Sequence, residues 1–424
     1  MKIAVIGGGS TYSPELLHGL AEAARGLGLI EVALHDLDPA RLQIVGDFVE
    51  RMVAAQGEKL TITRHTERTA AVSGARFVLV QIRVGGQLAR LEDERLGRSH
   101  GVIGQETTGI GGLAKALRTI PVLLEIAADV ERCAPGATLV DFTNPVSIIT
   151  EALLRHGRVP TIGLCNIPIS QREELAAHLG VTSSEVELDS VGLNHLSFIR
   201  GVKVRGQEQL PRLLEELAGA LASGNRPANL PDLDFPPELL TELGMIPSDY
   251  LRYFYLAPDT IAEQQAKPKL RAEEVMALEA ELLAYYGDPR RSERPEALKK
   301  RGGAFYSRAA VELITGIHHN TGDHRVVDVA NRGTVPELPE GCSIEVPCRI
   351  DARGATPLPQ RPLEPVIRGL IQHVKAYEEL AVKAALSRRR RDLYQAILAH
   401  PLTPSAKLAS RLTDALWARL TPEW

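Results

Sequence analysis

A chain of 424 residues with 44% hydrophobic and 24% charged residues has the composition of a globular enzyme and is long enough for two domains. Its net charge of -4 gives no indication of a basic surface that binds nucleic acid. No apolar run reaches membrane-spanning length. Four cysteines do not make a disulfide framework, and residues 2–6 form a predicted strand that leaves no room for a signal peptide. We therefore expect a cytoplasmic protein that binds neither nucleic acid nor a membrane.

The first part of the chain alternates predicted strands and helices. Strands are expected at residues 2–6, 31–35, 60–63, 77–82, 138–142 and 161–164. Helices are expected at residues 14–27, 40–55 and 114–132. Such alternation is typical of a parallel sheet covered on both faces, with ligands at the carboxyl ends of its strands. We predict a Rossmann-like domain over residues 1–185.

After residue 185 the pattern changes. The predicted elements are antiparallel strands at 190–199 and 202–205, a Pro-rich loop at 225–237, a helix at 270–286, an edge-like strand at 341–347 and helical structure at 363–399. This order is typical of an α+β unit that carries substrate, metal and oligomer contacts. We predict a second domain over residues 186–424.

A glycine-rich loop follows the first strand and consists of Gly7, Gly8, Gly9 and Ser10. Glycines let the backbone approach a pyrophosphate, and the helix that follows supplies free N–H groups. Tyr12 occupies the place of the usual third glycine. Asp36 ends the second strand, where a carboxylate binds ribose hydroxyls and favours NAD over NADP; Asp38 is the alternative. An ordinary strand–helix turn is the other interpretation of this loop.

Cys165 and His195 form a candidate metal pair. Cys165 ends a predicted strand, and His195 follows in Gly-Leu-Asn-His. A buried cysteine and a core histidine are the alternative interpretation. Thiolates favour zinc or iron, whereas Mg²⁺ and Mn²⁺ prefer oxygen, so the residues leave the metal open. Asn144 also follows a strand, where its amide could bind a sugar hydroxyl or only shape a turn.

Three further residues are candidates for binding or proton transfer. Glu106 is the carboxylate in a glycine-rich segment, and Arg90 could offer a bidentate fork to an anion or be an exposed helix charge. Tyr250 lies in a tyrosine-rich stretch that predicts either aromatic packing or a base. As a base, its pKa of ~10 must fall by two or three units, which a metal or cation could cause.

Three other clusters are predicted to be structural. His318, His319 and His324 are interpreted as a solvated loop in preference to a second metal site. The run of arginines at 388–391 is interpreted as a solvated helix face. The pair Cys342 and Cys348 has no zinc partners that we can identify.

With these motifs assembled, the chain resembles glycoside hydrolase family 4, the NAD- and metal-dependent glycosidases. The resemblance covers nearly the whole length and rests on these segments: IAVIGGGSTYSPEL (3–16), IGQETTGIGG (103–112), FTNP (142–145), GLCNIPI (163–169), GLNHLSF (192–198), YLRY (250–253), LRAEEVM (270–276), KRGG (300–303) and PC (347–348). Asn166, directly after Cys165, is similar to the 6-phospho-β-glucosidase branch of the family. Overall, a fold like that of lactate and malate dehydrogenases is implied.

The resemblance implies a role for each matching residue. Cys165 and His195 match the metal ligands, usually for Mn²⁺; Tyr250 matches the base that removes the C2 proton, and Glu106 matches the acidic residue that tunes it. The remaining matches are substrate-binding positions: Arg90, Asn144, Asn166 and Arg271. Glu273 departs from those relatives that carry a second arginine there, which puts the phosphate pocket in doubt.

The implied reaction is hydrolysis of a phosphorylated disaccharide or β-glucoside without net redox change. NAD⁺ takes a hydride from C3, the C2 proton leaves, the aglycone is eliminated from C1, water adds, and the hydride returns. Such a mechanism needs no pair of catalytic carboxylates. The alternatives are an NAD-dependent 2-hydroxyacid dehydrogenase with His195 as acid–base catalyst, a relative acting on α- or non-phosphorylated glycosides, and a catalytically silent NAD sensor. Dimers or tetramers are implied by the family.

Overall fold

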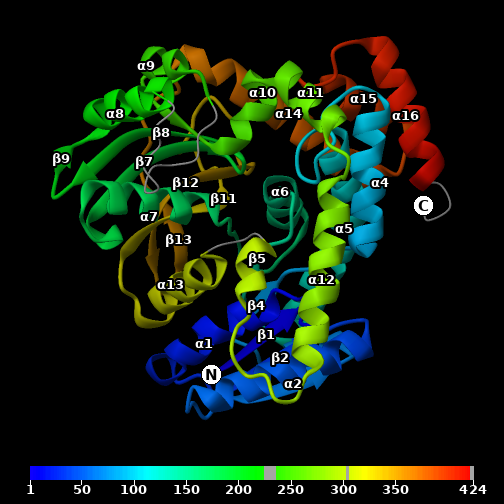
Figure 1. The fold of residues 1–424 in the computed structure, drawn as a ribbon, viewed down its shortest axis with the longest axis vertical. Coiled ribbons are helices and arrows are strands. Elements are labelled where there is room, and N and C mark those ends of the chain that lie inside the picture. The colour runs from blue at the N-terminus through cyan, green and yellow to red at the C-terminus, as the bar shows by residue number, and fades with distance from the viewer. Residues whose placement is uncertain (224–234, 302–304, 421–424) are drawn as a thin grey trace.

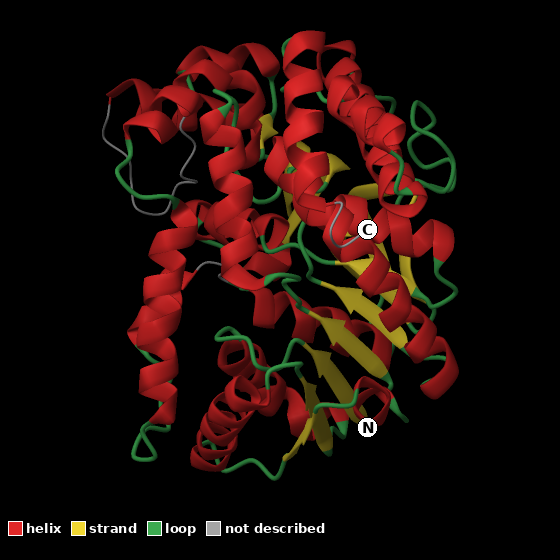
Figure 2. Cartoon of the chain, turned by 90° about the vertical axis from the view of Figure 1, so that its right-hand side faces the viewer, coloured by secondary structure: helices red, strands yellow, loops and turns green. Residues whose placement is uncertain are grey.

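The computed structural model describes residues 1–223, 235–301 and 305–420, apart from the side chains of 299–301 (Figure 1). Among these residues the strands join in a 13-stranded sheet in the order β10-β8-β7-β12-β11-β6-β5-β4-β1-β2-β3, with β13 beside β12 and β9 beside β8. Helices cover both faces of the twisted sheet (Figure 2). The chain thus has an α/β fold in which a parallel and an antiparallel part share one sheet.

The parallel part has the strand order β3-β2-β1-β4-β5-β6, which is the order of a Rossmann fold. Its strands are β1 (Lys2–Ile6), β2 (Glu31–His35), β3 (Thr61–His65), β4 (Phe77–Val80), β5 (Thr138–Asp141) and β6 (Thr161–Gly163). Its helices are α1 (Ser13–Leu27), α2 (Pro39–Ala55), α3 (Arg68–Val72), α4 (Gly86–Ser99), α5 (Gly109–Cys133), α6 (Val146–His156) and α7 (Ile167–Leu179). The alternation of short apolar strands with helices predicted this part.

The antiparallel part continues the sheet beyond β6. Its strands are β7 (Val186–Leu193), β8 (Leu196–Val204), β9 (Gln207–Glu208), β10 (Ile246–Pro247), β11 (Asp323–Ala330), β12 (Ser343–Asp351) and β13 (Gly354–Pro357). Its helices are α8 (Leu210–Ser223), α9 (Pro237–Leu243), α10 (Arg252–Tyr255), α11 (Ala257–Ala266), α12 (Arg271–Gly287), α13 (Tyr306–His319), α14 (Pro365–Ser387), α15 (Arg390–Ala399) and α16 (Ala406–Leu420). Three short 3₁₀ helices complete it: η1 (Ser183–Glu185), η2 (Asp249–Leu251) and η3 (Glu296–Arg301).

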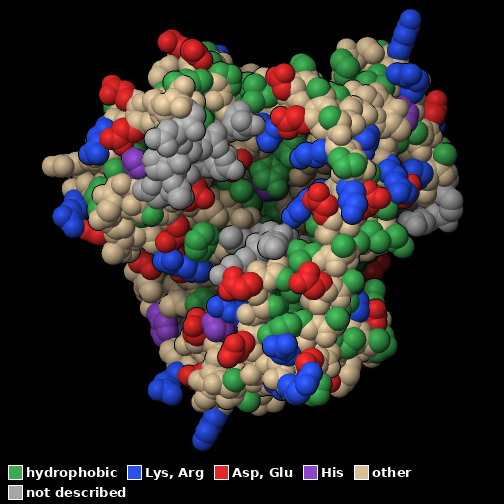
Figure 3. Space-filling model, viewed as in Figure 1, with side chains coloured by type: hydrophobic (Ala, Val, Ile, Leu, Met, Phe, Trp, Pro, Cys, Tyr) green, Lys and Arg blue, Asp and Glu red, His purple; other side chains and the backbone are tan. Residues whose placement is uncertain are grey.

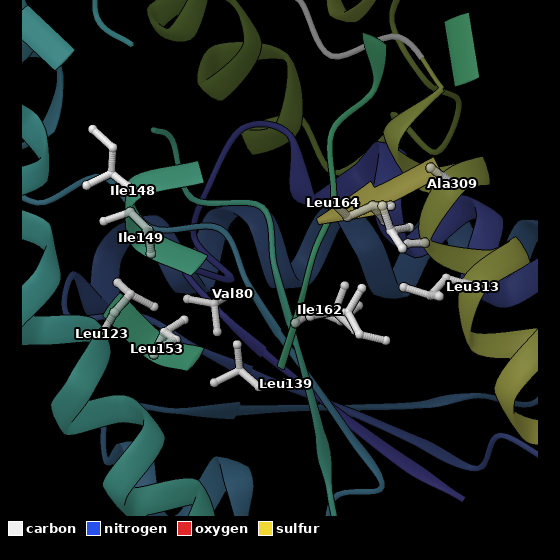
Figure 4. Close-up of a cluster of buried hydrophobic side chains, with 14 of the residues drawn as sticks. Val80, Leu123, Leu139, Ile148, Ile149, Leu153, Ile162, Leu164, Ala309 and Leu313 are labelled. Carbon is white, nitrogen blue, oxygen red and sulfur yellow. The ribbon is translucent and has the colours of Figure 1, made fainter. Parts of the chain in front are cut away.

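The core lies between the sheet and its covering helices. On one face, Val80 of β4 and Leu139 of β5 are buried beside Leu123 of α5 and Leu153 of α6 (Figure 4). On the other face, Ile162 of β6 points toward Leu313 of α13 (Figure 4). Because strands buried on both faces need apolar residues at successive positions, the continuous run Phe77–Val80 is typical of such a core strand.

The sheet is continuous across residue 185, and the division into domains at 185/186 stays a prediction. One strand prediction was wrong: residues 190–199 are not one strand, because a turn at Asn194 and His195 separates β7 from β8. The polar pair interrupts the apolar pattern at that point, and His195 has the left-handed φ of 64° that a tight turn requires. The predicted loop at 225–237 lies largely outside the described residues.

The predicted edge-like strand at 341–347 is instead central. Strand β12 pairs with β11 along its whole length, with β7 at Glu345 and with β13 from Cys348 onward. Pro347, which lacks an N–H donor, lies between the two contacts on that second side. A proline can therefore occupy this strand without removing a hydrogen bond from the ladder.

Two local predictions also need correction. His318 and His319 end α13 and His324 belongs to β11, so the loop is limited to residues 320–322, although all three imidazoles are exposed as expected. The arginine run at 388–391 spans the break between α14 and α15, because Arg388 takes the left-handed conformation that ends α14. No helix among the described residues is long and apolar enough to cross a membrane.

Candidate active site

The glycine loop packs too closely against the sheet to carry side chains. A Cβ at Gly7 would lie 2.7 Å from the carbonyl oxygen of Gln81, and one at Gly8 would lie 2.8 Å from Cβ of Leu34. The N–H groups of Gly7 and Gly8 both donate to the carbonyl of His35, at 2.9 and 2.7 Å. These contacts hold the loop between β1 and α1 at the carboxyl end of the sheet, where a Rossmann fold binds its dinucleotide.

Asp36 and Asp38 have different surroundings. Asp36 accepts hydrogen bonds from the N–H groups of Gly9 (2.9 Å) and Asp38 (3.1 Å) and faces the cavity described below. The side chain of Asp38 caps α2 by accepting from Ala40 and Arg41. Asp36 is thus hydrogen-bonded to the glycine loop, whereas Asp38 stabilises the start of α2. This geometry favours Asp36 for contact with a ribose.

One cavity of about 970 Å³ joins the glycine loop to residues of the antiparallel part. The predicted residues that line it are Gly7, Gly9, Ser10, Asp36, its alternative Asp38, Arg90, Glu106, Asn144, Asn166, His195, Tyr250 and Arg271. Gly8 and Cys165 are not in its wall, although Cys165 lies behind His195. The surface is hollowed near the centre of the space-filling view, with Lys and Arg side chains on its rim (Figure 3). Residues far apart in the chain therefore share one chamber.

Cys165 lies next to His195 at the wall of this chamber. The distance between Sγ of Cys165 and Nε2 of His195 is 3.5 Å, and both residues are buried. Burial lowers the pKa of His195 to about 3, so the imidazole is neutral and Nε2 can act as a ligand. Burial, with the charge of Glu345, raises the pKa of the Cys165 thiol above its usual range, so a bound cation would have to displace its proton.

Tyr250 stacks on the imidazole of this pair. The two rings are parallel within 4°, with centroids 3.7 Å apart. Burial raises the pKa of Tyr250 well above its usual value, Tyr253, Cys165 and Glu106 act in the same direction, and Arg90 opposes them. The protein alone therefore does not prepare a tyrosinate. A cation held by His195 would supply the positive charge that favours ionisation of the phenol.

Glu106 lies among three cations. Its carboxylate accepts from Arg83, from Nζ of Lys115 at 2.9 Å and from Nη1 of Arg90 at 3.3 Å. Burial opposes its ionisation, but Arg83, Lys115 and Arg90 outweigh burial and hold the pKa of Glu106 well below its usual range. Arg90 also donates to Glu94 at 2.7 Å and is buried, so the interpretation as an exposed helix charge is wrong. The cluster keeps Glu106 ionised.

The two asparagines lie at neighbouring strand ends. Asn144 follows β5, and its buried Oδ1 has no hydrogen-bond partner among the described residues. Asn166 begins α7 directly after Cys165 and lines the cavity. Because an unpartnered buried amide oxygen is costly, Asn144 is suited to accept a hydrogen bond from a bound molecule.

Arg271 lies at the first residue of α12 and is exposed at the cavity wall. Its guanidinium pairs with Glu274 at 2.9 Å, an exposed contact that a bound anion could replace. Glu273, the departure noted in the sequence, caps the same helix by accepting from the N–H of Leu270 at 2.9 Å. The residue at 273 therefore stabilises the helix start that carries Arg271.

Two family models match the chain, one for family 4 glycosyl hydrolases over residues 2–181 and one for their C-terminal domain over residues 190–403. The chain belongs to glycosyl hydrolase family 4. The 6-phospho-beta-glucosidase of Escherichia coli (strain K12) is 36% identical over 420 residues, which cover 97% of this chain and 93% of that protein. A crystal structure of the 6-phospho-beta-glucosidase from Thermotoga maritima, with NAD and glucose-6-phosphate, has a TM-score of 0.91 and 35% identity over 100% of this chain and 99% of that one.

The resemblance to the 6-phospho-β-glucosidase branch of family 4 is confirmed by these relatives. The expected likeness to malate dehydrogenase holds for the fold: the enzyme from Plasmodium falciparum has a TM-score of 0.54 at 14% identity, over 91% of this chain and 99% of that one. At this identity the likeness shows the fold alone. The Rossmann-like fold class is therefore confirmed.

Several residues of this family 4 chamber were missed from the sequence. Lys115 and Arg83 both contact Glu106, and Tyr306 lines the wall near Phe142. Burial and Arg83 lower the pKa of Lys115 to about 7, although Glu106 acts in the opposite direction. A single lysine within the apolar start of α5 was a usable signal, because a charge in such a run is rarely buried without a partner. Arg83 and Tyr306 had no comparable signal.

Proposed function

We propose that this chain hydrolyses 6-phospho-β-glucosides to glucose 6-phosphate and an aglycone, with NAD and a divalent metal, preferably Mn²⁺, as cofactors. The observation that carries this proposal is that His195, with Cys165 behind it, and Tyr250 line the same cavity as the glycine loop. Support comes from the relatives, which are named as 6-phospho-beta-glucosidases. Crystals of the Thermotoga maritima enzyme are described with manganese, NAD⁺ and glucose-6-phosphate.

The residues fit both cofactors. Asp36 and the Gly7–Ser10 loop would hold NAD, and a neutral imidazole opposite a thiol would hold the metal. Two protein ligands leave the remaining positions of the ion to water and sugar oxygens. When bound, NAD⁺ accepts a hydride from the sugar, and the metal acts as a Lewis acid on its hydroxyl oxygens.

The other residues bind the sugar and move its proton. We assign to Asn144 and Asn166 hydrogen bonds with sugar hydroxyls, and to Arg90 and Arg271 the recognition of the 6-phosphate. Tyr250 would remove the C2 proton, and the ionised Glu106 would influence that phenol through its position in the cation cluster. The free thiols of the four cysteines support a cytoplasmic location, and we expect a homodimer or homotetramer as in the family.

The first experiment tests the reaction. Nitrophenyl 6-phospho-β-glucosides with NAD⁺ and Mn²⁺ should release nitrophenol without net NADH, and chelation of the metal should abolish release until Mn²⁺ is restored. Accumulation of NADH would instead identify a dehydrogenase. Equal cleavage of the non-phosphorylated glucoside would contradict the anion-binding role of Arg90 and Arg271.

The second experiment tests the base. Tyr250→Phe should lower turnover roughly 10²–10⁴-fold and stop exchange of the substrate C2 proton with solvent, while NAD affinity stays at the wild-type value. Exchange is followed by NMR in deuterated buffer. Tyr253→Phe is the matched control, because its ring lies 5.7 Å from that of Tyr250 in the same cavity and it should retain exchange. Exchange in the Tyr250 variant would remove this residue from the role.

A further inference from the structure

A row of paired residues crosses the sheet beneath the Cys165–His195 pair. The register matches Gly163 of β6 with Asp328 of β11, Asp328 with Glu345 of β12, and Glu345 with Gly192 of β7. Side chains of directly opposed residues point to the same face of a sheet. The carboxyls of Asp328 and Glu345 are therefore neighbours, and each has a glycine on its other side.

Both carboxyls are in the interior, with exposed fractions of 0% for Asp328 and 1% for Glu345. Neither oxygen of Asp328 has a hydrogen-bond partner among the described residues, and Oε1 of Glu345 also has none. Such groups are expensive to bury and need a reason to be there. For Glu345 that reason is visible at its other oxygen.

Oε2 of Glu345 accepts a hydrogen bond of 2.9 Å from Nδ2 of Asn194. Asn194 and His195 form the whole turn between β7 and β8, and His195 is held at a φ of 64°. A residue with a side chain adopts this left-handed conformation only where its surroundings impose it. The bond from β12 ties the turn to the centre of the sheet and so fixes the place from which the imidazole projects.

We propose that Glu345 is a positioning residue: through Asn194 it holds the β7–β8 turn so that Nε2 of His195 faces Sγ of Cys165 across 3.5 Å, ready for one divalent cation. The proposal rests on the metal assignment made above. Groups that orient metal ligands typically contribute a factor of 10–100 to metal affinity. Glu345 would therefore act on binding of the metal and would not touch substrate.

The test is the affinity for Mn²⁺ without substrate, measured by electron paramagnetic resonance of the free ion. Glu345→Leu removes the acceptor and should weaken Mn²⁺ binding roughly 10–100-fold. Glu345→Gln should not weaken Mn²⁺ binding, because its amide oxygen can accept from Asn194 while its NH₂ donates to Asp328, and the variant also lacks the charge that opposes loss of the Cys165 proton. NAD⁺ affinity and the thermal unfolding temperature, measured on the same samples, report whether each variant is folded.

The matched control is Ser343→Ala. Ser343 lies two residues before Glu345 on β12 and is buried, and its Oγ has no partner among the described residues, so its loss should change neither Mn²⁺ nor NAD⁺ affinity. If Glu345→Leu does not fold, Asn194→Ala removes the same bond from the other side, together with the contact between Asn194 and Cys165, and should show at least the same loss. In a folded double variant the two losses should not add, because both remove one interaction.

The outcomes separate this proposal from the proposed function. Unchanged Mn²⁺ affinity in folded Glu345→Leu or Asn194→Ala would overturn the positioning role and leave the metal site intact. A loss in Glu345→Gln equal to that in Glu345→Leu would also overturn it, because the hydrogen bond would then not be the cause. Absence of Mn²⁺ binding by the wild type would overturn the metal site itself, and the positioning role with it.

Discussion

At the scale of single residues, two aspartates that lie close together after β2 have different roles. The carboxylate of Asp36 accepts a hydrogen bond from the N–H of Gly9 in the glycine loop, whereas the side chain of Asp38 caps α2. A helix cap is a local task that any residue with a short acceptor can perform. A ribose ligand must instead lie beside the glycine loop, and of the two aspartates it is Asp36 that is hydrogen-bonded to this loop.

This difference leads to a prediction for the two aspartates. Asp36→Ala should weaken NAD⁺ binding by roughly tenfold, the value of one lost charge-assisted hydrogen bond, and should reduce discrimination against NADP⁺. Isothermal titration with both nucleotides measures this change. Asp38→Asn is the control, because asparagine also caps helices, and it should bind NAD⁺ as the wild type does. An equal loss in both variants would contradict the division of tasks.

At the scale of elements, β6 is the point where the parallel and antiparallel parts of the sheet meet. It pairs with β5 in parallel and with β11 in the antiparallel sense at Gly163, directly before Leu164 and Cys165. The helix α6 packs across the same position. A Cβ on residue 163 would lie 2.3 Å from Oγ1 of Thr150 and 2.8 Å from Cβ of Asp328. Only a glycine therefore fits at residue 163 in this junction without movement of its neighbours.

We predict that Gly163→Ala destabilises the protein by about 1–3 kcal/mol, because the neighbours of the new methyl group are branched or lie on a strand and cannot move freely. Urea denaturation followed by circular dichroism measures the change. Gly219→Ala in α8 is the control: no atom lies within 4 Å of its new Cβ, so this substitution should be neutral or stabilising by up to ~1 kcal/mol. A Gly163 variant as stable as the wild type would show that α6 can shift.

At the scale of the whole molecule, the C-terminal helices are joined to the rest by buried polar groups. Lys375 of α14 lies between Glu151 of α6 and Glu378, with both carboxylates at 2.5 Å. His400, directly after α15, is buried against the ring of Tyr377, with centroids 4.2 Å apart, and its Nδ1 accepts from the N–H of Leu402. The first contact joins α14 to α6, and the second joins the end of α15 to α14.

His400 makes stability depend on pH. Burial, with a smaller effect of His373, lowers the pKa of His400 from 6.5 to about 3, so the folded protein keeps it neutral while the unfolded chain takes up a proton. Its contribution is complete above pH 6.5 and is lost as the pH falls toward 3. From pH 7 to pH 5 the loss should be about 2 kcal/mol.

The measurement compares the wild type with His400→Asn, which can keep an acceptor for Leu402 but does not titrate. Urea denaturation at pH 7 and pH 5 should show a smaller decrease in the free energy of unfolding for the variant. The variant also loses the packing of the imidazole ring, but this loss is the same at both pH values. The change in the free energy of unfolding between pH 7 and pH 5 therefore reflects protonation of His400 alone. Equal decreases would show that His400 is protonated in the folded protein.

Local sequence patterns predicted the parallel half of the fold and the identity of most candidate residues. Apolar strands such as Phe77–Val80, alternating with amphipathic helices, carry their information in local spacing, and the glycine loop is a contiguous motif. The same local patterns gave wrong predictions for the β7–β8 turn and for the position of β12 in the sheet. Strand pairing depends on residues far apart in the chain, which periodicity does not record.

The construction of the chamber depends on tertiary contacts that the sequence patterns did not predict. It brought Tyr250 onto His195, gave Arg90 two carboxylate partners and placed Lys115 beside Glu106. It also placed Glu345 under the turn that carries His195. The physical reason is that short-range patterns set the backbone of each element, whereas contacts and buried charges depend on distances between elements, which exist only once the sheet is assembled.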